Sequence, residues 1–138
     1  MIEFHEAWIL KAQSDLGTAE VLIRQDNPIT DTAIYHTQQC AEKALKGFLA
    51  YHQAEIPKIH HLVMLVNQCA EFDPTFDSLL SDANELSPKG TLFRYPDDID
   101  EMSDESQLFP VVEEVVEAIV KAKRILDFVK AKISHGSG

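Results

Sequence analysis

The chain has 138 residues, of which 45% are hydrophobic and 25% charged. This length and balance suit one domain with its own core and argue against disorder. No apolar run approaches the roughly 20 residues that a membrane span needs. The net charge is −11, from 12 Lys and Arg against 23 Asp and Glu, so we expect neither DNA nor a membrane as a partner. The acidic N-terminus is unlike a secretory signal, so the expected location is cytoplasmic.

Apolar residues recur with helical periodicity throughout, which predicts an all-α fold. The first helix is expected over residues 3–25, ahead of an Asn-Pro turn signal. Thr30 or Asp31 can cap a second helix that reaches residue 55.

Further helices are expected over residues 61–72, 75–87 and 108–133, with an exposed acidic loop before the last one. Three long and two short helices with mostly short connections predict an up-and-down antiparallel bundle with a four-helix core. We expect one domain over residues 1–133 and a flexible tail over residues 134–138.

Asp15 is the residue that fits such a bundle least well. On a helical wheel it lies in the middle of the apolar stripe of the first helix, between Trp8 and Leu22. A buried carboxylate needs a partner, because burying it alone costs several kcal/mol. The expected partners are Arg94 and His60, either in a structural network that fixes helix register or in a ligand site.

The second helix carries a dense group of long polar side chains. Gln38 and Glu42 lie at the border of its apolar face, while Gln39, Lys43 and Lys46 line its opposite flank. Two interpretations stay open. The flank is either a solvated surface with an exposed Glu42–Lys46 pair, or part of a polar groove that takes a ligand.

Two rows of apolar residues lie outside the helix faces that a single core would bury. They are Val112, Val116 and Val120 on the last helix, and Leu10, Gly17 and Val21 on the first. Extra apolar lines on acidic helices favour a partner surface, so we expect a homodimer.

No glycine-rich phosphate loop, nucleophile elbow or helical zinc motif occurs in the sequence. His60 and His61 are adjacent, and adjacent side chains diverge on a helix, which makes them a poor metal pair. Cys40 and Cys69 lie in apolar patterns typical of buried thiols. We therefore expect no metal and no cofactor.

Several short motifs together match a known pattern. They are Trp8, Asp15 and Leu22 in the first helix; Tyr35-His36, Gln38-Gln39, Glu42-Lys43-Ala44 and Lys46 in the second; His60 and Leu62 before the third; and Arg94-Tyr95-Pro96 after the fourth. These motifs resemble those of the HEPN domain, a five-helix bundle. The resemblance runs from Trp8 to about Val129.

Many HEPN proteins are metal-independent ribonucleases with an Arg-x4–6-His motif, which this chain lacks. Arg94 is followed by YPDDIDE, and Arg124 by no histidine before His135. The resemblance instead implies the branch paired with a minimal nucleotidyltransferase in a toxin–antitoxin-like pair. There the bundle would bind a nucleotide, an RNA or the transferase.

Three hypotheses follow for the function. In the leading one, a homodimeric module binds a nucleotide or RNA through Arg94, Tyr95, His60, Lys43 and Lys46, supported by Asp15, Gln38, Gln39 and Glu42. In the alternative, the protein is a ribonuclease with His60 and Arg94 as catalytic residues. In the third, the polar residues only stabilise a structural or interaction bundle.

Overall fold

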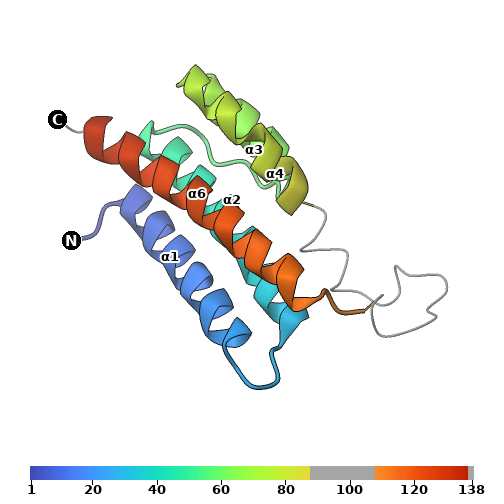
Figure 1. Cartoon of the computed structure of the whole chain (residues 1–138). Coiled ribbons are helices and arrows are strands. Elements are labelled where there is room, and N and C mark those ends of the chain that lie inside the picture. Colours follow the sequence, from blue (N-terminus) through green and yellow to red (C-terminus); the bar gives the residue numbers. More distant parts are fainter. Residues whose placement is uncertain (88–107, 137–138) are drawn as a thin grey trace.

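The computed structural model describes residues 1–87 and 108–136, and every regular element in these ranges is helical. The three long helices are α1 (Phe4–Ile23), α2 (Thr30–Tyr51) and α6 (Val112–Gly136). The short ones are α3 (Leu62–Ala70), the 3₁₀ helix η1 (Pro74–Leu79) and α4 (Leu80–Leu86). Figure 1 shows the long helices side by side, with α3 and α4 together at one side. The predicted all-α bundle is confirmed.

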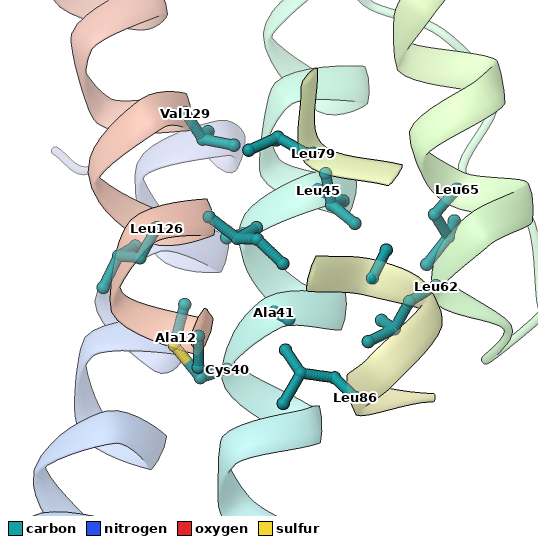
Figure 2. Close-up of a cluster of buried hydrophobic side chains, with 14 of the residues drawn as sticks. Ala12, Cys40, Ala41, Leu45, Leu62, Leu65, Leu79, Leu86, Leu126 and Val129 are labelled. Carbon is teal, nitrogen blue, oxygen red and sulfur yellow. The ribbon is translucent and has the colours of Figure 1, made fainter. Parts of the chain in front are cut away.

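Helix α2 is the centre of the bundle. Its contact with α1 is the most extensive in the fold, and it also packs against α6, α3 and α4. In Figure 2, Ala41 and Leu45 of α2 lie between the side chains of α3 and α4 and those of α6. Burial of a leucine side chain such as that of Leu45 contributes about 1.5–3 kcal/mol to the stability of the fold. None of the helices in the described ranges has the length and apolar character to cross a membrane.

Several helix ends differ from the sequence-based expectation. Ile29 is the N-cap of α2 and makes no side-chain cap bond, so neither Thr30 nor Asp31 is the cap. The expected helix over 75–87 is η1 followed by α4, and the Asp73 side chain caps η1 by accepting a hydrogen bond from the Thr75 amide at 3.0 Å.

The last helix begins at Val112 rather than residue 108, and it continues to Gly136. Helical backbone dihedrals are disfavoured for a residue that precedes proline. Phe109 precedes Pro110 and therefore delays the start of the helix.

The connection between α2 and α3 turns back along α2. It leaves at Tyr51, passes Gln53 with a left-handed φ of 58°, and brings His60 to within 2.9 Å of Glu42. The first amide of α3, on Leu62, then donates to the Ser87 hydroxyl at 3.0 Å. The N-terminus of α3 is therefore capped from the end of α4, and His61 makes no side-chain cap bond.

The close approach of α1 to α2 occurs at a glycine. A methyl group added at Gly47 would lie 3.0 Å from Ile9 Cδ1 and 3.2 Å from Trp8 Cβ. Gly17 differs, because a methyl group there would meet nothing within 4 Å. Only Gly47 is therefore required for the packing of α1 on α2.

We expect Gly17→Ala to raise the free energy of unfolding by about 1 kcal/mol, because alanine is the better helix former. Gly47→Ala should give no gain or a loss, because α1 must move to accommodate the methyl group. Urea denaturation of the two variants measures the difference. An equal gain in both would contradict the tight contact at Gly47.

Candidate functional site

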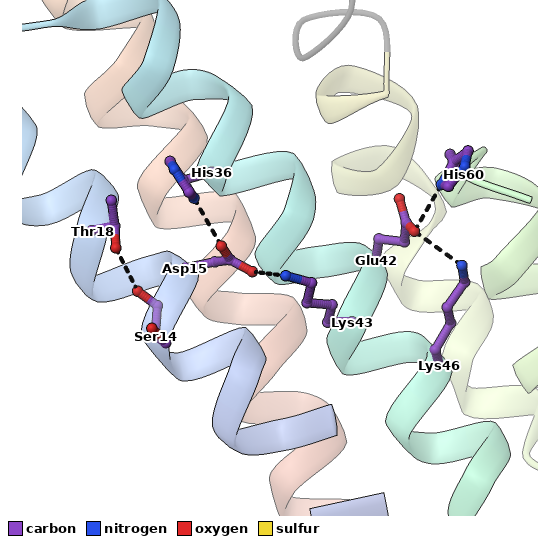
Figure 3. A network of polar contacts seen from close by, with 8 residues as sticks. All are labelled: Ser14, Asp15, Thr18, His36, Glu42, Lys43, Lys46 and His60. Carbon is purple, nitrogen blue, oxygen red and sulfur yellow. Dashed lines mark hydrogen bonds and ion pairs between the residues drawn. The ribbon is translucent and has the colours of Figure 1, made fainter. Parts of the chain in front are cut away.

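Asp15, which is 7% exposed, pairs through both of its carboxylate oxygens with α2. The Lys43 ammonium donates to Oδ2 at 2.7 Å, and Nδ1 of His36 lies 2.8 Å from Oδ1 (Figure 3). His36 and Lys43 are seven residues apart, which places them two turns apart on one helix face. The network predicted for Asp15 exists, and its partners among the described residues are His36 and Lys43.

His60 was expected beside Asp15 and instead pairs with Glu42. Glu42 is 4% exposed, and its Oε2 accepts a hydrogen bond from Lys46 at 3.0 Å while lying 2.9 Å from His60 Nδ1. Figure 3 shows both contacts meeting on one carboxylate oxygen. The His60 side chain is 75% exposed. The histidine therefore links a buried ion pair to the protein surface.

The interpretation in which Lys46 lies on a solvated surface is wrong. Lys46 is 5% exposed, and its ammonium lies 6.0 Å from the centre of the Trp8 ring. Trp8 comes from α1, which packs closely here because of Gly47. The Glu42–Lys46 pair forms as the sequence indicated, but inside the bundle rather than on a solvated surface.

Four predicted site residues remain, and one further site residue was not predicted. Gln38 is buried and Gln39 is half-buried, so Gln38 belongs to the core rather than to its border. Arg94 and Tyr95 lie outside the described residues. His36 was missed as a site residue, although its spacing of seven from Lys43 was visible in the sequence.

We call His36, Gln39, Glu42, Lys43 and Lys46 the polar face of α2. The positive charges on this face are paired, because the Asp15 carboxylate neutralises the charge of Lys43 and the Glu42 carboxylate neutralises that of Lys46. The two carboxylates thus balance the two ammonium groups. The polar face presents positioned hydrogen-bond donors and little net positive charge.

The two cysteines take no part in this site. Burial raises the pKa of both thiols to about 12, and nearby Asp15 adds to the effect on Cys40. Both thiols therefore stay protonated near neutral pH, where only a thiolate would be a nucleophile. Cys69 instead donates to the Leu45 carbonyl at 3.5 Å.

Two other features lie around the start of α1. Ligand atoms of Glu3, His5 and Glu6 lie within 4.8 Å of one another, and both carboxylates are exposed. An open groove of about 490 Å³ runs between α1 and the end of α6, lined by Ile9 and Lys130 among others. Neither feature contains a predicted site residue.

The Asp15 pairs should stabilise the protein measurably. We expect Asp15→Asn to lower the free energy of unfolding by about 2–3 kcal/mol, less than for a fully buried pair because both partners remain partly exposed. Asp127→Asn is the matched control, since its 3.5 Å pair with Lys123 is 58% exposed on both sides. That change should cost less than about 0.5 kcal/mol. Equal losses in urea denaturation would refute a special role for Asp15.

Comparison with known proteins identifies relatives of this fold. A family model described as "HEPN domain" matches residues 5–132. The crystal structure of TT1696 from Thermus thermophilus has a TM-score of 0.81 at 24% identity, covering 95% of this chain and 99% of that one. ST0689, described as an archaeal HEPN homologue, has a TM-score of 0.73 at 29% identity, covering 96% and 99%. No curated protein matches the sequence.

Proposed function

The chain belongs to the HEPN domain family, and on that premise we propose that it is a nucleotide- or RNA-binding module that uses the polar face of α2. One observation carries the proposal. Two buried carboxylates, Asp15 and Glu42, each hold one lysine and one histidine in place. A plain bundle needs no such arrangement, because apolar residues of similar volume stabilise a core equally well.

The pairing leaves hydrogen-bonding capacity directed away from each carboxylate. A lysine ammonium has three donors, so Lys43 keeps two for a ligand after its bond to Asp15. His36 and His60 each contact a carboxylate through Nδ1, which leaves Nε2 for another partner. Positioning these groups before binding lowers the entropy cost of holding a ligand. Arg94 and Tyr95 complete the proposed set of contacts.

Binding should be measurable by calorimetry with ATP, GTP and a short RNA. We expect Lys43→Met and His60→Ala each to weaken binding at least about tenfold, because each removes a charged or polar contact worth about 1.5–3 kcal/mol. Lys123→Met on α6 is the control and should bind as the unmodified protein does. Absence of heat with all three ligands would reject the binding proposal.

The binding module would also act in an assembly. Val116 and Val120 of α6 are 46% and 49% exposed, and Leu10 and Val21 of α1 are 50% and 55% exposed. These side chains belong to the two rows of apolar residues that were predicted to contact a partner. The two rows lie on neighbouring helices, because α1 packs against α6. We infer that they form the interface of a homodimer. A minimal nucleotidyltransferase remains the proposed partner protein.

A second candidate function is supported by the geometry of His60. Glu42 holds its Nδ1 at 2.9 Å, which would orient the exposed imidazole so that Nε2 takes a proton from a ribose 2′-hydroxyl. This arrangement favours a residual ribonuclease, with Arg94 stabilising the developing charge. The missing Arg-x4–6-His motif makes it the alternative rather than the leading proposal.

Incubation with total RNA, followed by gel electrophoresis, tests the ribonuclease. If the protein cleaves RNA, His60→Ala should lower the cleavage rate by a factor of about 10²–10⁴, which is the usual contribution of a general base. His61→Ala, the neighbouring exposed histidine, should leave the rate unchanged. Cleavage that survives in both variants would come from another residue or from a contaminant.

A further inference from the structure

Three side chains at the start of α1 bring metal-binding atoms to one point. One atom each of Glu3, His5 and Glu6 lies within 4.8 Å of the other two, and these atoms are two carboxylate oxygens and one imidazole nitrogen. Carboxylate and imidazole are ligands that zinc and other divalent transition metals take in proteins. Within residues 1–87 and 108–136, this is the one group of three side chains with such a geometry.

The spacing of His5 and Glu3 suits two ligands of one ion. His5 Nδ1 lies 3.5 Å from Glu3 Oε2, which is longer than the roughly 2.7–3.2 Å of a good N–H···O hydrogen bond. Two atoms bound tetrahedrally to one zinc ion at about 2.0–2.2 Å are about 3.3–3.6 Å apart. The Glu3 carboxylate is available for this role, because it makes no hydrogen bond that caps α1.

The two carboxylates repel each other unless a cation lies between them. Ligand oxygens of Glu3 and Glu6 carry like charges within 4.8 Å. The positive end of the α1 dipole favours each carboxylate singly, but a divalent cation would convert their repulsion into two attractions. The net charge of −11 also attracts cations to the protein.

His5 is the ligand that the fold holds in place. Its side chain is only 14% exposed, and its ring packs edge-on against Tyr51 of α2 with the ring centres 5.1 Å apart. A ligand that packing has already positioned loses less conformational entropy when it binds an ion. The two exposed carboxylates can then close on an ion that the imidazole holds.

The same three residues line the groove of about 490 Å³ between α1 and the end of α6, together with Tyr51 and Lys130 among others. Figure 1 shows these two helix ends at the same end of the bundle. Three protein ligands leave one tetrahedral position for water or a bound molecule, as at catalytic zinc sites. The described residues that line the groove include no member of the polar face of α2, so the two sites are separate.

We propose that Glu3, His5 and Glu6 bind a zinc ion, with one coordination position open toward the groove. Magnesium and calcium suit this set of ligands poorly, because both prefer oxygen ligands to an imidazole nitrogen. Manganese binds nitrogen and oxygen ligands more weakly than zinc does. The inference does not depend on nucleotide or RNA binding, so either proposal can fail without the other.

Calorimetric titration with zinc chloride tests the site on the metal-free protein without an affinity tag, because tag histidines bind metal. We expect one zinc ion per chain at the tightest site and no comparable binding of magnesium. His5→Gln should weaken zinc binding at least tenfold, because it removes the nitrogen ligand. His61→Gln, which changes an exposed histidine outside the groove, is the matched control and should bind zinc as the unmodified protein does.

Cobalt(II) in place of zinc reports on the open position through its visible absorption. We expect a four- or five-coordinate spectrum that is stronger than that of the aqueous ion and is lost in His5→Gln. Thiocyanate, which binds open positions on cobalt, should change the spectrum. A spectrum that thiocyanate leaves unchanged overturns the open position.

Two results overturn the metal site itself. One is absence of zinc binding to the unmodified protein, and the other is equal zinc affinity in His5→Gln and the unmodified protein. Circular dichroism checks that each variant is folded. If His5→Gln does not fold, the double variant Glu3→Gln and Glu6→Gln replaces it, since both side chains are exposed. That variant should also bind zinc at least tenfold more weakly, and unchanged affinity in it likewise overturns the site.

Discussion

The burial of α2 on almost every side is the constraint on which the rest of the structure depends. A helix in that position has to place its charged residues against partners, because water is not there to solvate them. Glu42 and Lys46 meet this requirement within one helix, and Lys43 meets it through Asp15 of α1. The connection between α2 and α3 has to return along α2 for His60 to reach the same carboxylate. The candidate site and the stability of the fold therefore rest on the same few contacts.

Helical periodicity predicted the bundle well, because the apolar spacing of the long helices is regular and each helix has one buried face. Helix ends were predicted less well, as the cap of α2 and the late start of α6 illustrate. Caps depend on backbone geometry that several neighbouring residues can satisfy, whereas periodicity averages over a whole helix. Asp15 was correctly identified as a residue that requires partners. Which partners it takes depends on how α1 and α2 align, and single-helix patterns do not specify this.

Lys46 shows why a helical wheel can mislead. The wheel separates α2 into an apolar side and a polar flank, and Lys46 falls on the flank. The flank is covered because Gly47 allows α1 to approach closely and places Trp8 over the ammonium. The signal was present in the sequence as a glycine next to a lysine in the interior of a helix, where glycine is otherwise unfavourable. Its meaning required the partner helix.

The return of the chain along α2 also bears on how the molecule folds. The contacts between α1 and α2 join residues that are separated by 21 or 28 positions in the sequence, and His60 contacts Glu42 across a separation of only 18 positions. Short loops close at lower entropic cost than long ones, so we expect the contacts of the α1–α2 hairpin and of the segment that follows it to form early in folding. The core contacts of α6 with α2 span a much longer stretch of chain. The polar face of α2 would thus take shape in the folding nucleus, before α6 docks to complete the core.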